Sequence, residues 1–156
     1  MMIIINRNNS ENIEINKLAK IVIKQMEFIG VKNNLEPTGN AIKNALKNDR
    51  AIFFIKLNEN RDYVGFAFGN IGSGLETGSD YLWINELFVE PEYRRKKIAT
   101  EFFCFIEKWA RDNEIKYIAA MTSKKNKSAI NFYKNAEYGL SDVKWIDKHI
   151  LRGKNA

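Results

Sequence analysis

Cysteine, histidine and proline are scarce in this sequence, which contains one cysteine, one histidine and two prolines. The single cysteine, Cys104, excludes an internal disulfide, and no cluster of cysteines and histidines suggests a zinc site. Cys104 lies beside Phe103 and Phe105, a setting that predicts a buried apolar residue rather than a nucleophile. His149 has no serine, cysteine or acidic pattern near it that would suggest a catalytic triad, so we expect a structural or exposed side chain.

Long apolar runs are also missing. The opening segment Met1 to Ile5 is too short for the core of a signal peptide and has no basic residues before it. No later run approaches the roughly 20 residues of a membrane span. We therefore expect a cytoplasmic protein without a membrane partner. The length of 156 residues, 45% of them hydrophobic and 28% charged, is typical of one globular domain, residues 1–156.

Positive charge exceeds negative charge, with 25 lysines and arginines against 19 acidic residues and a net charge of +6. Such a surplus favours an anionic partner, which can be nucleic acid, an anionic membrane or a phosphorylated ligand. The basic residues form no zinc finger, no clear recognition helix and no aromatic pattern typical of RNA-binding sheets. The sequence therefore disfavours nucleic acid, although a nucleic-acid-binding module stays as an alternative.

Strand and helix patterns alternate along the chain. After a short first strand, helices are expected at 15–29, 41–46, 98–112 and 127–136, and strands at 51–55, 63–70, 81–89 and 115–121. The glycine-containing segment 71–80 predicts a mobile connection. Residues 138–151 predict one or two final strands in antiparallel pairing. This order indicates a mixed α/β sheet with helices on its faces.

A basic turn, Tyr93 to Thr100, joins the strand at 81–89 to the next helix. Its four successive cationic residues are Arg94, Arg95, Lys96 and Lys97. Unpaired backbone N–H groups and the positive end of the helix dipole make a helix start an anion site. Because cations in the first turn oppose that dipole, a bound anion would relieve the conflict. The turn therefore predicts a pyrophosphate site, and a solvated basic surface is the alternative.

Three blocks of this sequence resemble the GNAT N-acetyltransferase superfamily. The family's turn motif is Gln or Arg, two residues, Gly, one residue, then Gly or Ala; Arg94 and Ala99 match it, and Lys97 stands at the first glycine position. Upstream, residues 85–93 (NELFVEPEY) are similar to the family's central strand. Downstream, residues 126–134 (NKSAINFYK) are similar to its second cofactor-contacting helix. The resemblance covers residues 51–138 well and the earlier part weakly.

This resemblance implies one acyltransferase domain, built on a twisted, mostly antiparallel mixed sheet of about six to seven strands with helices on both faces. It implies acetyl-coenzyme A (acetyl-CoA) as cosubstrate, an amine as acceptor and no metal, in a monomer or homodimer. The acceptor can be a small amine, an aminoglycoside-like polyamine or a protein amine. By resemblance its pocket comes from residues 13–47 and 71–80, where no motif identifies it. A non-catalytic acyl-CoA sensor is the alternative function.

The reaction itself directs attention to two side chains. An alkyl ammonium has a pKa of roughly 10.4 and must lose a proton before it can attack, and a nearby carboxylate can act as the base. The resemblance makes Glu86 that base, and a paired or solvated strand carboxylate is the alternative. It makes Tyr133 the proton donor to the departing thiolate, because a phenol is still protonated at neutral pH.

Cofactor contacts follow from the same resemblance. Backbone N–H groups at a bulge in the central strand are expected to stabilise charge on the thioester oxygen. Lys97 is expected to point outward so that the N–H groups of the turn still face the phosphates. The expected cofactor-binding residues are Leu87, Phe88, Val89, Arg94, Arg95, Lys96, Lys97, Ile98, Ala99, Thr100, Asn126, Ala129 and Tyr133.

Overall fold

The structure is a computed structural model that describes residues 1–148 and 150. It contains two compact units, Met1–Met121 and Thr122–Ala156. The sequence-based expectations for His149, and for the end of the final strand at Leu151, lie outside the described residues.

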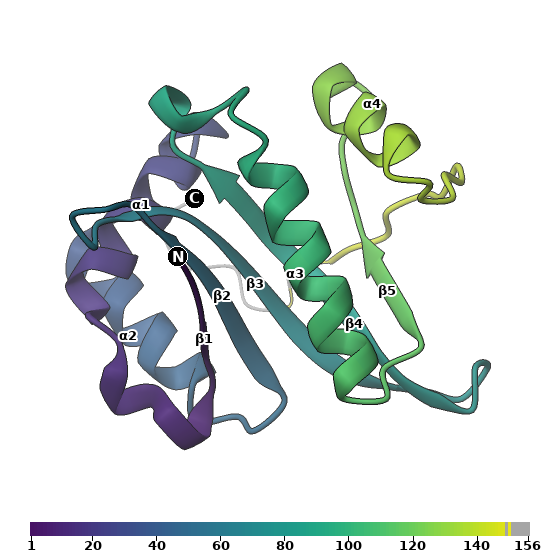
Figure 1. Cartoon of the computed structure of the whole chain (residues 1–156), viewed down its shortest axis with the longest axis horizontal. Coiled ribbons are helices and arrows are strands. Elements are labelled where there is room, and N and C mark those ends of the chain that lie inside the picture. Colours follow the sequence, from purple (N-terminus) through teal and green to yellow (C-terminus); the bar gives the residue numbers. More distant parts are fainter. Residues whose placement is uncertain (149, 151–156) are drawn as a thin grey trace. The chain divides into compact units, whose positions relative to one another are not determined.

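The first unit is built on one mixed sheet (Figure 1). Its elements are β1 (Met2–Ile5), the 3-10 helix η1 (Arg7–Asn12), α1 (Ile15–Phe28), α2 (Leu35–Ala45), β2 (Ala51–Leu57), β3 (Tyr63–Gly74), β4 (Ser79–Val89), the 3-10 helix η2 (Pro91–Tyr93), α3 (Ile98–Asp112) and β5 (Tyr117–Ala120). The strands lie in the order β1-β2-β3-β4-β5. Neighbouring strands are antiparallel except β4 and β5, which are parallel. The predicted mixed, mostly antiparallel sheet is confirmed.

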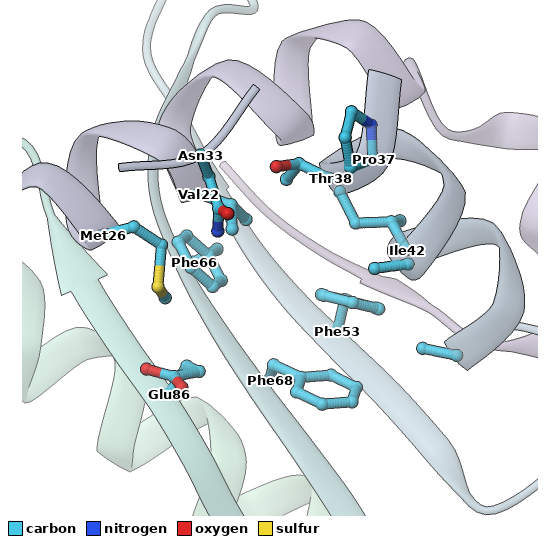
Figure 2. A pocket seen from close by; sticks show the side chains of 12 residues that line it. Val22, Met26, Asn33, Pro37, Thr38, Ile42, Phe53, Phe66, Phe68 and Glu86 are labelled. Carbon is cyan, nitrogen blue, oxygen red and sulfur yellow. The ribbon is translucent and has the colours of Figure 1, made fainter. Parts of the chain in front are cut away.

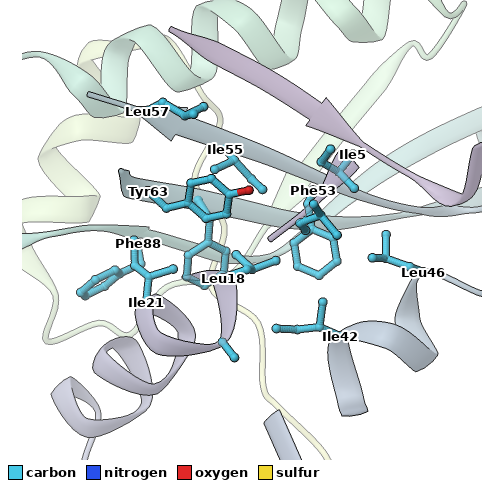
Figure 3. Packing of buried hydrophobic residues seen from close by; sticks show 13 residues of the cluster. Ile5, Leu18, Ile21, Ile42, Leu46, Phe53, Ile55, Leu57, Tyr63 and Phe88 are labelled. Carbon is cyan, nitrogen blue, oxygen red and sulfur yellow. The ribbon is translucent and has the colours of Figure 1, made fainter. Parts of the chain in front are cut away.

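Apolar side chains cover both faces of this sheet. On one face, Leu18 of α1 and Ile42 of α2 belong to the same buried cluster as Phe53 of β2 (Figure 3). On the other face, Phe102 of α3 is fully buried in a second cluster with Phe54. Phe53 and Phe54 are neighbours on β2 and so point to opposite faces. The prediction of helices on both faces is confirmed.

Two segments of the first unit differ from the expectation. The glycine-containing residues 71–80 form the end of a β3–β4 hairpin, in which Gly74 pairs with Ser79, rather than a mobile connection. Small polar residues extend this ladder because the pairing is made by backbone groups. Helix α2 begins at Leu35, well before the predicted residue 41. Pro37 is tolerated there because the N–H that it lacks has no partner in a first helical turn.

The second unit contains the helix α4 (Lys127–Asn135). The prediction of one or two final strands after this helix is wrong. Residues 138–148 form no strand, and the side chains of Val143, Trp145 and Ile146 are exposed. A run of apolar and polar residues becomes a strand only where a partner edge pairs with it. Within residues 1–148 and 150 the sheet therefore has five strands rather than six or seven.

Cys104, on α3, is exposed, so the prediction of a buried cysteine is wrong. The helix buries Phe102 and Ile106 against the sheet, and Phe103 is buried as well. At 3.6 residues per turn, Cys104 lies about 100° around the helix from Phe103 and on the solvent side.

Among the described residues, no helix is long and apolar enough to cross a membrane.

Candidate active site

A β-bulge in β4 determines which way Glu86 points. Phe68 of β3 pairs with Glu86 and Gly69 pairs with Ile84, so that Asn85 is an extra residue on β4. Before the bulge, Leu82 and Ile84 face the α3 side of the sheet. In a regular strand Glu86, two residues after Ile84, would face that side too. The bulge interrupts the alternation, so Glu86 points to the opposite face, where it lines a pocket beneath α1 and α2 (Figure 2).

Glu86 is half-buried in this pocket and has one side-chain partner from α1. Gln25 donates a hydrogen bond from Nε2 to Oε2 of Glu86. Burial raises the pKa of the Glu86 carboxyl above its usual value, and the hydrogen bond from Gln25 partly opposes that effect. A raised pKa makes the ionised carboxylate a stronger base. The group therefore has the properties that a proton acceptor needs.

The pocket itself is mostly apolar and has a volume of about 310 Å³. Its walls come from α1, α2, the residues between these helices and three strands. The lining residues are Val22, Met26, Asn33, Pro37, Thr38, Ala41, Ile42, Ala45, Phe53, Phe66, Phe68 and Glu86. Most of the lining residues come from segment 13–47, and none of them comes from 71–80.

The last residues of β4 leave one backbone edge uncovered. Strand β5 pairs only with Tyr81 to Ile84, and in the described part of the chain no strand pairs with residues 85–89 on that side. The N–H of Glu90, just after β4, donates to the oxygen of Val64 in β3 at 3.0 Å. Because backbone groups alternate along a strand, the N–H groups of Leu87 and Val89 point to the uncovered edge. The N–H of Phe88 points to β3.

Arg94, the first cation of the predicted phosphate turn, is half-buried and held by the end of β4. Its Nε donates to the backbone oxygen of Val89 at 2.9 Å. Its guanidinium lies over two aromatic rings, with its central carbon 4.6 Å from the ring centre of Phe28 and 5.4 Å from that of Phe88. Arg94 thus ties the turn to β4 and α1, whereas Arg95, Lys96 and Lys97 are exposed.

The backbone of the turn has the conformation that glycine would favour. Arg95 and Lys97 have positive φ angles of 59° and 61°. Lys97 is also the N-cap of α3, and its side chain makes no capping hydrogen bond to the described residues of that helix. Lys97 accordingly adopts the left-handed conformation that suits a glycine at this position of the motif, at a steric cost that glycine would not have. Its exposed side chain agrees with the outward orientation that the sequence analysis expected.

The start of α3 has the features of an anion site. The first intrahelical bond runs from the N–H of Glu101 to the oxygen of Lys97, at 2.9 Å. The N–H groups of Ile98, Ala99 and Thr100 precede it and so have no partner within the helix. They lie beside the three exposed cations of the turn. Together with the uncovered edge of β4, this arrangement fits a ligand that carries both a pyrophosphate and an extended amide arm, as acetyl-CoA does.

The second unit holds the other predicted site residues. Asn126 caps α4, because its Oδ1 accepts a hydrogen bond from the N–H of Ala129 at 3.1 Å. Tyr133 is half-buried, and burial raises the pKa of its phenol above the usual value. Its ring meets those of Phe132 and Tyr138 edge-on, with centroids 5.6 and 5.7 Å away. The phenol therefore stays protonated at neutral pH and can donate a proton.

Sequence reasoning missed Gln25 and Thr38. A signal for Gln25 was present, because this polar residue occupies the apolar stripe of α1 and is buried with Leu18 and Ile21. Thr38 carried no signal, since helix α2 was not predicted to extend that far.

In the described residues, no group of three or more His, Cys, Asp or Glu could hold a metal ion.

Comparison with known proteins gives the family. The sequence model described as "Acetyltransferase (GNAT) family" matches residues 17–138. Among curated proteins, none matches the sequence. One similar solved structure is a probable acetyltransferase, with 17% identity, a TM-score of 0.83 and coverage of 98% of this chain and 99% of that chain.

Two further structures share the fold. One is an aminoglycoside acetyltransferase from an uncultured soil metagenomic sample, in complex with sisomicin (14% identity, TM-score 0.80, coverage 97% and 96%). The other is an aminoglycoside N-acetyltransferase in complex with CoA (15% identity, TM-score 0.76, coverage 97% and 96%). At such identities the likeness concerns the fold, and the family rests on the sequence match. The protein belongs to the acetyltransferase (GNAT) family and is an acetyl-CoA-dependent N-acetyltransferase.

Proposed function

We propose that this protein transfers the acetyl group of acetyl-CoA to a primary amine by direct attack within a ternary complex, with Glu86 as general base. The observation that carries the proposal is the bulge at Asn85. It turns the Glu86 carboxylate into a pocket, while Leu87 and Val89 present N–H groups at an edge that no strand of the described residues covers. A base and a pair of oxyanion donors thus come from one short stretch of β4.

The reaction converts an ammonium and a thioester into an amide, a thiol and one proton. The acceptor's ammonium loses one proton to Glu86, directly or through a water. Its nitrogen lone pair then forms the N–C bond to the acetyl carbon as the C–S bond breaks. Tyr133 protonates the departing thiolate and regains its proton from solvent. The nitrogen gives up its second proton, and one proton is released for each amide formed.

Backbone donors on β4 stabilise the charge that develops on the thioester oxygen. Leu87 and Val89 direct their N–H groups to the uncovered edge, so we assign this role to these two rather than to Phe88. Phe88 supports the site by its buried ring. Preorganised donors of this kind contribute about 10²–10³-fold each to the rate in enzymes where one has been removed.

The turn from Arg94 to Thr100 binds the pyrophosphate. The N–H groups of Ile98, Ala99 and Thr100 and the exposed Arg95, Lys96 and Lys97 supply the donors and the charge. Arg94 positions the turn through Val89. We further propose that Asn126 and Ala129, at the start of α4, contact the same cosubstrate. Both units then act as one acyltransferase domain, as a family match that spans residues 17–138 supports.

A thermal shift and a thiol-release assay test this proposal. Acetyl-CoA at about 100 times its dissociation constant should stabilise the protein by about 2.7 kcal/mol. Release of CoA thiol should then depend on an added amine. Cys104 is exposed and will react with a thiol reagent, so the assay is run on Cys104→Ser as well as on the parent. Binding without turnover on any amine would favour the acyl-CoA sensor, and no shift at millimolar acetyl-CoA would overturn the proposal.

A further inference from the structure

We propose that the acceptor is a primary monoamine on a compact apolar body, aromatic or branched aliphatic, that carries one hydrogen-bonding group away from the amine. This inference rests on the proposed function, because it takes the pocket beneath α1 and α2 as the acceptor site. It separates one class of amine from the polyamines, aminoglycosides and protein amines that the family alone leaves open.

The walls of the pocket match an apolar body. Nine of its twelve lining residues have apolar side chains, and three of these, Phe53, Phe66 and Phe68, present aromatic rings. Figure 2 shows these rings between α2 and the strand that carries Glu86. A volume of about 310 Å³ is at the lower end of small-molecule sites, which measure about 300–1,000 Å³. That space suits one ring or a short branched chain better than several linked sugar rings.

The charge of the pocket matches one ammonium. Glu86 is the single carboxylate that lines it within the described part of the chain. A second ammonium brought into the pocket would lose water without gaining a partner, and an unpaired buried charge is strongly disfavoured. Asp80, an acidic residue on β4, already pairs with Arg50 at 3.1 Å and does not line the pocket. The site therefore selects against polycations.

Thr38 adds a polar requirement. Its side-chain oxygen is buried, its residue is 6% exposed, and the oxygen has no hydrogen-bond partner among the described residues. Thr38 lines the pocket and lies across it from Glu86 in Figure 2. A buried hydroxyl without a partner is disfavoured, and a ligand group that bonds to it relieves that penalty. An acceptor with a hydroxyl or carbonyl distant from its amine meets this need.

Acceptor preference tests the inference. We compare kcat/KM for phenethylamine, tyramine, putrescine, spermidine and kanamycin at saturating acetyl-CoA. We expect tyramine and phenethylamine to exceed the three polycations at least tenfold, with tyramine ahead of phenethylamine. Preference for a polycation would overturn the inference and leave the proposed function standing.

Measurements of amine binding distinguish a failure of this inference from a failure of the proposed reaction. If no amine is acetylated, thermal shifts with tyramine and with putrescine are measured in the presence of CoA. A shift with tyramine alone supports the inference while the proposed reaction fails. Equal shifts, or none with either amine, overturn the inference.

Pocket variants locate the acceptor. Ala41 lines the pocket and is exposed at its rim, so Ala41→Trp should reduce its volume without disturbing the core. Asn40 lies next to it on α2, is exposed and does not line the pocket, so Asn40→Trp is the matched control. We expect Ala41→Trp to raise KM for tyramine at least tenfold with KM for acetyl-CoA unchanged, and Asn40→Trp to change neither. Equal values for the two variants would place the acceptor elsewhere.

The hydroxyl of Thr38 is tested by Thr38→Val, which keeps the shape of the side chain. We expect the variant to lose the preference for tyramine over phenethylamine while phenethylamine is acetylated as before. A preference that survives in Thr38→Val would show that Thr38 does not contact the acceptor.

Discussion

Gln25 of α1 donates a hydrogen bond to the carboxylate of Glu86 on β4, two elements that are far apart in the sequence. The bond fixes the direction of the carboxylate within the pocket and stabilises its charged form. Burial acts in the opposite sense on the same group. The basicity of Glu86 is therefore a balance between an apolar pocket and one amide donor, and both can be changed by mutation.

The first prediction concerns Glu86 itself. Glu86→Gln removes the base but keeps a group that can accept from Gln25, so we expect kcat/KM to fall by about 10²–10⁴-fold with affinity for acetyl-CoA unchanged. Steady-state kinetics and a titration with CoA measure the two quantities. A loss of less than threefold would mean that Glu86 is the structural carboxylate of the alternative interpretation.

Stability gives an independent test of the Glu86 environment. The folded protein raises the pKa of this carboxyl, so the native state binds the proton more tightly than the unfolded chain. Stability that depends on this group is then present at low pH and falls as pH rises through the interval above 4.5. We expect Glu86→Gln to gain in unfolding temperature relative to the parent as pH rises from 4 to 7. A constant difference across this range would contradict the raised pKa.

The second prediction concerns Gln25. Gln25→Met fills a similar volume without a donor, so the pKa of Glu86 should rise further and the acidic limb of kcat/KM should move to higher pH. The variant should regain activity at alkaline pH, a result that general damage to the fold would not give. An acidic limb in the same position as in the parent would show that the hydrogen bond does not affect the base.

The third prediction concerns the left-handed backbone at Lys97. Lys97→Gly should raise the free energy of unfolding by about 1 kcal/mol, because glycine adopts a positive φ without the steric penalty. Lys96→Gly is the matched control: it removes the same charge one residue earlier, where φ is not positive, and should lower stability. Denaturant unfolding without ligand measures both variants. A Lys97→Gly protein less stable than Lys96→Gly would contradict the observed backbone.

The fourth prediction concerns Tyr133. Tyr133→Phe should lower kcat much more than it changes the dissociation constant of acetyl-CoA, because the phenol acts on the leaving thiolate. Burial raises the pKa of this phenol, so an alkaline limb below pH 10 should belong to another group and should persist in the variant. Equal kcat values in the variant and the parent would remove Tyr133 from the mechanism.

Local patterns predicted the elements that form the framework of the site. The strand at 81–89, the basic turn and the helix that follows it were recognisable because alternation, charge and helical spacing are properties of neighbouring residues. Asn126 stands directly before the predicted helix at 127–136, a position from which it caps α4 in the structure. The presence of a bulge followed from the family resemblance, and its position at Asn85 did not.

Features that depend on distant residues were not predictable in the same way. Gln25 meets Glu86 because α1 folds over β4, and Arg94 is held by Phe28 of α1 as well as by Val89 at the end of β4. The tail after α4 carries apolar residues but forms no strand between 138 and 148, because strand formation depends on pairing with a distant segment and not on the local pattern alone. Burial of Cys104 was inferred from neighbouring phenylalanines, yet orientation around the helix axis decided its exposure.

The extra residue at Asn85 reverses the alternation of β4, so that even-numbered residues face α3 up to Ile84 and the pocket side from Glu86 onward. A pattern read across the whole strand therefore assigns one of its two halves to the wrong face. Deleting Asn85 would place Glu86 directly after Ile84 in a regular ladder and would leave it opposite Phe68 on the pocket face. The deletion would remove the local distortion of β4 and keep the orientation of the base, so it would separate the contributions of these two features to the rate.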